Sequence, residues 1–264
     1  FLFAQNTYVP DDKFEQALID LGYDTTLDDS VLTANISGVT TLDVSSKEIS
    51  DLTGIEAFVA LESLSCAYNK LTSLDVSKNT ALTTLRCYSN QLTSLDVSKN
   101  TALTTLSCAF NELTSIDVSK NIALTGLYCH FNQLTSLDVS NNTALEELSC
   151  DSNQLTSLNM RNGVNLESKY AFDATNNPNL TCIETLDPAH ATTNLAYIDA
   201  GVTFSLSCME EDFEWVSSAS DTINITESNL ADTYTLQWES SNDESSVNYR
   251  VYAKIGVYPA EQMY

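Results

Sequence analysis

Apolar residues follow one repeating pattern through the middle of the chain. From Leu61 onward the arrangement L-x-x-L-x-C-x-x-N-x-L-x-x-L-D-V-S-x-N returns every 21 residues with little change. Five cysteines mark this period: Cys66, Cys87, Cys108, Cys129 and Cys150. A unit this short cannot bury its own apolar residues, so successive units must stack and share one continuous core.

Each unit predicts one short strand. The L-x-C segment alternates with period two, so Leu64 and Cys66 face the core while Ser63, Ser65 and Ala67 face solvent. The asparagine that follows, Asn69 in this unit, is expected to turn inward and to hydrogen-bond backbone groups that the bend leaves unpaired. The later S-L-D-V-S segment predicts short strands or single helical turns, since 21 residues leave little room for a full helix.

The two ends of the repeat array depart from the pattern. Residues 39–60 form a 22-residue unit with Val44 in the cysteine position, and Leu61 begins the next unit. Before it, Asp12 and Glu15 match a capping box that begins a short helix, and Gly22 ends that helix. The apolar face of this helix consists of Phe14, Leu18 and Leu21. At the far end three extra residues shift the motif, and the leucine, cysteine and asparagine positions fall to Phe172, Ala174 and Asn177.

The repeating pattern is similar to the signature of leucine-rich repeats, with cysteine in the third apolar position. We therefore predict a leucine-rich-repeat solenoid of the right-handed β/α horseshoe type, mostly β, with a parallel sheet on its concave face. A helical cap precedes the repeats and a disulfide-containing cap follows them. Stretches such as 233–238 and 247–253 resemble the opening strands of a fibronectin type III sandwich, which needs about 100 residues.

Five segments are expected along the chain. Residues 1–4 are similar to the tail of a signal peptide. The N-terminal cap follows at 5–38, the repeats at 39–181 and the C-terminal cap at 182–208. The last segment, 209–264, is expected to be the truncated start of a fibronectin-III/Ig-like β domain.

The units resemble those of the internalin family, specifically its cysteine-ladder branch. The resemblance to secreted flavobacterial leucine-rich-repeat proteins is closer, because the opening 9–18 is similar to their N-terminal cap. The closing stretches 177–183 and 198–208 are similar to their C-terminal cap. This resemblance covers roughly Tyr8 to Cys208. It implies a secreted or bacterial cell-surface protein with a role in adhesion or recognition, and it supplies no catalytic residues.

Charge narrows the range of partners. The chain contains 36 Asp and Glu but 11 Lys and Arg, a formal net charge of −25. Such a polyanion repels phosphate backbones and anionic membrane surfaces, so nucleic acid is not an expected partner. No apolar run approaches the roughly 20 residues that a membrane span needs. A monomer is expected.

The cysteines fall into two classes. Stacked strands lie about 4.8 Å apart, whereas a disulfide needs converging Cβ atoms about 3.5 to 4.5 Å apart. The five ladder cysteines are therefore expected to be buried, reduced thiols that fill the core and have no redox or metal role. Cys182 and Cys208 lie outside the ladder, in the cap, and are predicted to pair with each other.

Aromatic residues occupy positions that the repeat leaves free. We predict a ligand-binding strip on the concave face because these side chains are not needed for the core. The strip consists of Tyr68, Arg86, Tyr88, Phe110, Tyr128, His130 and Phe131. Such a strip can stack on sugar rings or anchor side chains of a protein partner. The alternative is that the rings only stack on one another between coils.

A second ladder is acidic and consists of Asp75, Asp96, Asp117 and Asp138. Stacked carboxylates can hold Ca²⁺, which takes six to eight oxygen ligands. However, lysines follow three residues later at 78, 99 and 120, and serine and lysine are poor neighbours for calcium. We therefore expect these aspartates to cap turns, and we expect no metal ion and no cofactor.

No convergent set of acid, base and nucleophile supports an enzyme. The chain has two histidines, and a contact between His130 and Asp151 is more typical of a surface hydrogen bond. We expect a module that recognises a protein through its concave face. Glycan binding is the alternative, and a structural spacer that carries a downstream domain is the third possibility.

Overall fold

The computed structural model describes residues 5–164, 166, 171–208, 222–227, 234–239 and 252–253. The chain separates into two compact units, Phe1–Met209 and Glu210–Tyr264. In the second unit β14 (Thr222–Glu227), β15 (Tyr234–Glu239) and β16 (Tyr252–Ala253) form an antiparallel sheet. The strand predicted at 233–238 is thus present with a one-residue shift. The segment 1–4 and most of 247–253 lie outside the described residues.

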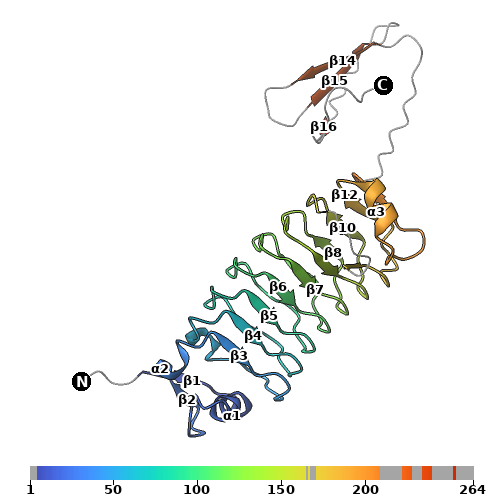
Figure 1. The fold of residues 1–264 in the computed structure, drawn as a ribbon. Helices are drawn as coiled ribbons and strands as arrows, with labels where there is room; N and C mark the ends of the chain where they lie inside the picture. Colours follow the sequence, from blue (N-terminus) through green and yellow to red (C-terminus); the bar gives the residue numbers. More distant parts are fainter. Residues whose placement is uncertain are drawn as a thin grey trace. The chain divides into compact units, whose positions relative to one another are not determined.

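A seven-stranded parallel sheet forms the centre of the first unit (Figure 1). Its strands stack in the order β3, β4, β5, β6, β7, β9 and β11. Their bounds are Thr41–Asp43, Ser63–Ser65, Thr84–Arg86, Thr105–Ser107, Gly126–Tyr128, Glu147–Ser149 and Phe172–Asp173. The middle residues are in register from Leu42 to Leu148, and Phe172 continues the series as predicted. One parallel strand per repeat is therefore confirmed.

The core and the solvent-facing positions agree with the prediction with one exception. Leu64 and Cys66 are fully buried, and Val44 takes the place of the cysteine in the 22-residue coil. Ala67 was expected to face solvent, but it is 0% exposed. This expectation was wrong because β4 ends at Ser65, so the alternation of a strand does not extend to residue 67.

The return side of the coils carries a second parallel sheet of four strands, in the order β13, β12, β10 and β8. Their bounds are Thr203–Ser205, Cys182–Thr185, Ser157–Met160 and Ser136–Asp138. The S-L-D-V-S segment forms a strand at Ser136–Asp138. In the earlier repeats this segment leads into a turn. In the first repeat the N–H of Asn79 closes the turn by donating a hydrogen bond to the carbonyl of Val76, at 3.0 Å.

The N-terminal cap combines two helices with a short antiparallel pair (Figure 1). β1 (Asn6–Tyr8) pairs with β2 (Ser30–Leu32), and the helices are α1 (Asp12–Asp20) and α2 (Thr33–Ile36), followed by the 3₁₀ turn η1 (Ile55–Ala57). Gly22 ends α1 with φ 82°, as predicted. Its N–H donates to the carbonyl of Ile19 while that of Tyr23 donates to Leu18, a Schellman closure.

Three details of α1 differ from the prediction. The helix is capped by Asp11, whose Oδ1 accepts from Lys13 and Phe14, and not by Asp12. Glu15 is 0% exposed and accepts from the loop before β2, so the predicted capping box does not form. Leu21 is 46% exposed because it lies at the end of the helix, outside the apolar face.

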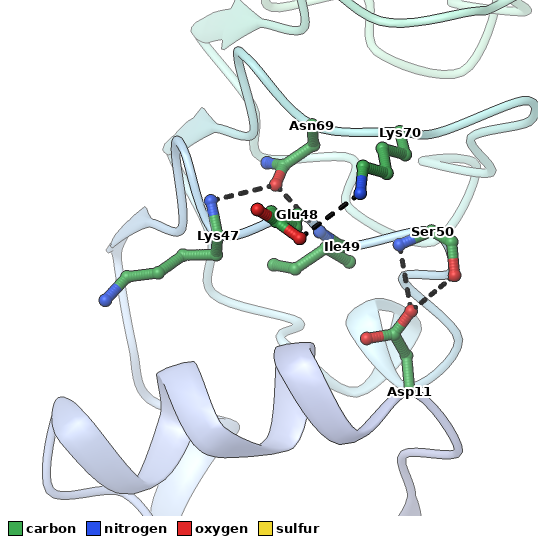
Figure 2. Close-up of polar contacts among 7 residues, drawn as sticks. All are labelled: Asp11, Lys47, Glu48, Ile49, Ser50, Asn69 and Lys70. Carbon is green, nitrogen blue, oxygen red and sulfur yellow. Dashed lines mark hydrogen bonds and ion pairs between the residues drawn. The ribbon is translucent and has the colours of Figure 1, made fainter.

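Asp11 also fastens the cap to the first coil, as Figure 2 shows. Its Oδ2 accepts from the backbone N–H of Ser50 at 2.8 Å and from the hydroxyl of the same residue at 2.7 Å. Burial acts to raise the pKa of Asp11, but these hydrogen bonds outweigh it and lower the pKa. One carboxylate therefore joins α1 to the repeats.

The asparagine after each ladder cysteine turns inward, as predicted. Asn69 donates to the carbonyls of Val44, Cys66 and Ala67. Its Oδ1 accepts from the backbone N–H groups of Lys47 and Ile49 in the coil before (Figure 2). The same contacts recur along the stack, ending at Asn177. Each coil is thus tied to the previous one through buried amides.

A second asparagine ladder was not anticipated. Asn100 donates to the carbonyls of Val76 and Asn79 in the previous coil, at 3.0 and 2.9 Å. Four buried residues share this arrangement: Asn79, Asn100, Asn121 and Asn142. The asparagine that closes the four repeats from Leu61 to Asn142 was the signal in the sequence that pointed to it.

The predicted burial and pairing of the cysteines are confirmed. The five ladder cysteines are buried and unpaired. Burial raises the pKa of the Cys66 thiol to about 12, which keeps the thiol protonated. Cys182 and Cys208 form a disulfide in the C-terminal cap, next to α3 (Pro188–Asn194).

Candidate recognition surface

The three-residue strands of the seven-stranded sheet direct their first and last residues away from the core, except that Gly126 of β7 is buried and has no side chain. The residues that begin the strands form one row, in which Glu147 is the charged member and hydroxyl side chains are common. The residues that end them form a second row: Asp43, Ser65, Arg86, Ser107, Tyr128, Ser149 and Asp173. Two predicted binding residues, Arg86 and Tyr128, therefore lie on the sheet itself, with β6 between their strands.

The ring of Tyr128 lies over Gly126 of its own strand. A Cβ atom on Gly126 would lie 3.1 Å from Cε2 of Tyr128, closer than most such contacts. The corresponding residues in the preceding repeats are Ser63, Thr84 and Thr105. The glycine thus leaves space for the ring to lie along the sheet.

The hydroxyl of Tyr128 donates to the carboxylate of Glu147 on the next strand. Burial and this hydrogen bond raise the pKa of Tyr128 to about 12, while the charge of Arg86 acts in the opposite direction. The phenol therefore stays protonated at neutral pH.

A chain of polar contacts runs beside this pair. The hydroxyl of Ser149 donates to Oδ1 of Asp151 at 2.9 Å and lies 3.0 Å from Nδ1 of His130. Because the serine proton points to the aspartate, Nδ1 of His130 is the donor in the second contact. His130 and Asp151 are therefore bridged by Ser149. The serine is not held as a nucleophile with histidine as its base, which would require the opposite direction.

Five of the predicted residues lie in the turn after each strand. Tyr68, Phe110 and Phe131 are each the second residue after a ladder cysteine, with φ of 55°, 52° and 51°. The equivalent residues in other coils also have positive φ, and they are Ser46, Ser89, Ser152 and Asn176. Bulky residues rarely adopt this left-handed conformation. The turn needs the conformation but no aromatic ring.

The rings gather in two groups. The aromatic pair consists of Tyr68 and Tyr88, edge to face at 5.1 Å. The aromatic trio consists of Phe110, His130 and Phe131, with the two phenylalanines stacked at 4.5 Å and the imidazole edge-on to both. Ser89 occupies the ring position in the coil that carries Tyr88. The predicted strip is thus divided into two clusters at the end of the strands.

The rings stack on one another and yet stay open to solvent. Tyr68 is 58% exposed, Phe110 47% and Phe131 48%. Contacts between coils, the alternative interpretation of these aromatics, therefore cover only about half of each ring. The remaining half presents apolar area next to the polar rows of the sheet.

A shallow depression of about 250 Å³ adjoins Tyr128. It is lined by Tyr128, Glu147, Leu148, Ser149, Ala171 and Asp173. Small-molecule sites usually enclose about 300 to 1,000 Å³, so this depression is at the small end. Glu147 and Asp173 were missed from the sequence. The signal in the sequence was their position in the repeat, because Glu147 lies three residues before Cys150 and Asp173 lies one residue before Ala174.

The acidic ladder caps turns, as predicted. Each aspartate accepts from the backbone N–H of the serine two residues later, at 2.8 Å, in Asp75, Asp96, Asp117 and Asp138. For Asp75 this backbone hydrogen bond is the largest cause of a lowered pKa, and the charge of Lys78 contributes. Within the described part of the chain, no helix is long and apolar enough to cross a membrane.

No protein-family model matches the chain. Over 75 residues it is 44% identical to internalin J of Listeria monocytogenes serotype 4b (strain F2365), which is 28% of this chain and 8% of that protein. The solved functional domain of InlJ from Listeria monocytogenes, which includes a cysteine ladder, is 30% identical, with a TM-score of 0.46. That comparison covers 70% of this chain and 53% of the other.

The internalin InlF from Listeria monocytogenes is 20% identical to the chain, with a TM-score of 0.57, and establishes likeness of fold. The comparison covers 75% of this chain and 59% of InlF, so the chain spans little more than half of either internalin structure. The predicted fold class is confirmed by the stacked parallel strands and by this likeness. The repeat segment is thus a leucine-rich-repeat solenoid with a cysteine ladder, and over 75 residues its sequence is similar to that of internalin J.

Proposed function

We propose that the chain is a recognition module that binds a protein partner, outside the cell or at its surface, through the exposed side of the repeat sheet. The ligand-binding residues are the aromatic pair, the aromatic trio, Arg86 and Tyr128. The observation that carries the proposal is the placement of Tyr68, Phe110 and Phe131 at a left-handed turn position that serine fills in other coils.

The energetics of the turn favour this interpretation. A left-handed conformation costs any non-glycine residue on the order of 1 kcal/mol or more, and the three aromatic coils bear this cost as the serine coils do. Stacking of Phe110 on Phe131 contributes about 0.5 to 1.5 kcal/mol, which offsets it only in part. Burying the half of each ring that is exposed would contribute about 1 kcal/mol per ring on binding. Binding to a partner would therefore release free energy of apolar burial that folding alone does not release.

Charge supports a basic partner. The chain has a formal net charge of −25, and the rows of the sheet carry Asp43, Glu147 and Asp173 around a single arginine. Complementary charge accelerates association and weakens with added salt. We expect the association rate to fall as ionic strength rises, while the dissociation rate follows the aromatic contacts.

The test is binding of the purified chain to a panel of cell-surface proteins and polysaccharides by biolayer interferometry. The variant carries three substitutions, Tyr68→Ser, Phe110→Ser and Phe131→Ser. Other coils have serine at the equivalent position, so we expect the variant to fold. The matched control is Ile122→Thr, which removes an apolar side chain of 61% exposure and restores the threonine found at 80, 101 and 143.

A protein ligand that the triple variant loses and the control keeps supports the proposal. Binding that survives the triple change contradicts a role for the aromatic clusters. Stability is measured beside binding. The proposal expects Phe110→Ser to cost no more than about 1.5 kcal/mol, because only ring stacking is lost and serine adopts the same left-handed conformation at 89. A cost above about 2 kcal/mol would show that the ring serves folding.

Glycan binding is the second candidate, and the depression beside Tyr128 favours it. An aromatic face next to Glu147, Ser149 and Asp173 offers a stacking surface with hydrogen-bond acceptors. A polysaccharide ligand lost by Tyr128→Ala and kept by the triple serine variant would select this function. If no ligand of either class binds, the spacer function is favoured.

A further inference from the structure

Three carboxylates meet in the N-terminal cap. Glu15 comes from α1, and Asp24 and Asp28 come from the loop that joins α1 to β2. One carboxylate oxygen of each residue lies within 4.8 Å of the others. Acidic residues are abundant in this chain, so their proximity alone does not define a site.

Hydrogen bonding distinguishes this cluster from a chance grouping. Glu15 is 0% exposed, and its Oε1 accepts from the backbone N–H groups of Asp28 and Ser30, both at 2.9 Å. Its second oxygen, Oε2, is buried and has no hydrogen-bond partner among the described residues. Oδ2 of Asp24 is in the same situation. Two buried carboxylate oxygens without a donor from the chain are costly unless a cation or a water molecule contacts them.

No cationic side chain supplies that charge. Among the described residues the ion pairs are Lys47 with Asp20 and Lys70 with Glu48, and neither includes a member of the cluster. Three carboxylates without a counter-ion repel one another, and the repulsion is strongest around the buried Glu15. The arrangement therefore calls for a small cation.

We propose that Glu15, Asp24 and Asp28 bind a calcium ion. Calcium takes six to eight oxygens at about 2.3 to 2.6 Å, so two oxygens on one ion are at most about 5 Å apart. The spacing of the cluster meets this limit without movement of the backbone. Magnesium requires shorter distances of about 2.0 to 2.1 Å and near-octahedral geometry, which fits less well. Water completes the coordination.

The ion would add to the hydrogen bonds that already join Glu15 to the backbone of Asp28 and Ser30. Glu15 belongs to the helix, whereas both aspartates belong to the loop that leads into β2. Behind this junction lie Phe14 and Leu18, which close the first layer of the core. Calcium would therefore protect the open end of the solenoid, where a missing neighbour leaves apolar residues to be covered.

The experiment is isothermal titration of the full chain, stripped with a chelator, with calcium chloride at about 0.15 M salt to screen non-specific attraction. The variants are Asp24→Asn, Asp28→Asn and the double variant that combines them, and each substitution keeps the shape of the side chain. The control is Asp12→Asn, an exposed carboxylate of α1 outside the cluster. Melting temperature is recorded for each protein with and without calcium.

We expect one site in the native chain and in the control, with an affinity about tenfold or more weaker in each cluster variant. Calcium should raise the melting temperature of the native chain by several degrees and leave that of the double variant unchanged. Equal affinity in the double variant, equal affinity for magnesium, or absence of calcium binding to the folded native chain would each overturn the proposal. Asp28 is exposed, so its variant remains informative even if Asp24→Asn unfolds.

Discussion

Asn132 fixes the turn that presents His130 and Phe131. Its Nδ2 donates to the carbonyls of Cys108 at 3.0 Å, Cys129 at 3.1 Å and His130 at 3.4 Å. Its Oδ1 accepts from the backbone N–H of Leu113 at 3.0 Å, in the coil before. The substitution Asn132→Ala removes all four hydrogen bonds and leaves the backbone groups in place. The residue is only 8% exposed, so water does not readily replace the amide.

The expected cost follows from the three shorter hydrogen bonds. A buried backbone group left without a partner costs about 1 to 3 kcal/mol, and relaxation of the turn recovers part of it. We therefore expect Asn132→Ala to lower the free energy of unfolding by about 3 to 5 kcal/mol. The neighbouring exposed amide provides a matched control, since Gln133→Ala is expected to change the stability by less than about 0.5 kcal/mol.

Equilibrium unfolding in urea, followed by circular dichroism, measures both variants. Each coil contacts only its neighbours, so the m-value is recorded with the midpoint to detect unfolding of the stack in parts. A loss below about 1 kcal/mol at unchanged m, or a loss equal to that of Gln133→Ala, would refute the assignment of stability to the asparagine ladder.

Three further outcomes are expected. Burial raises the pKa of the Cys108 thiol to about 12, so ladder thiols should react with a colorimetric thiol reagent only after denaturation; rapid reaction of the folded chain would contradict this. The pKa of Tyr128 is about 12 in the folded chain and near 10 in the unfolded chain, so the folded state favours the neutral phenol. The contribution of this phenol to the free energy of unfolding is therefore complete below about pH 10 and is lost as the pH rises toward 12. Glu147→Gln should lower the midpoint of tyrosinate absorbance, and an unchanged midpoint argues against the contact. Replacing Cys182 and Cys208 by serine, which opens a loop with a sequence separation of 26, should lower the stability of the cap by about 3 kcal/mol in a thermal melt, and an unchanged melt would contradict it.

The period of the repeats made most of the fold predictable. A unit of 21 residues with fixed leucine, cysteine and asparagine positions leaves one strand and one inward turn as the arrangement that buries every apolar residue. The shifted unit at Phe172 followed the same reasoning, because counting from the asparagine at 177 restored the register. These positions are constrained by packing, and packing can be read from spacing.

Details of the structure that depend on a single side-chain hydrogen bond were harder to predict from the sequence. Asp11 and Asp12 are adjacent and chemically identical, and the capping-box spacing to Glu15 favoured Asp12, although Asp11 is the cap. Glu15 matched the box equally well, yet its carboxylate faces the loop at Asp28 and Ser30, a contact between distant parts of the sequence. The position of the rings in a left-handed turn was also hidden, because aromatic residues rarely adopt positive φ.

The stack of coils separates what folding requires from what it permits. The leucine, cysteine and asparagine positions are repeated because each closes a layer of the same core. The left-handed turn is repeated as well, but its side chain is serine at 46, 89 and 152, and a ring at 68, 110 and 131. Since one backbone accepts both, the ring contributes nothing that the turn needs. Its exposed half, beside Tyr128 and the polar rows of the sheet, is where the chain departs from its own repeat, and where a ligand would be discriminated.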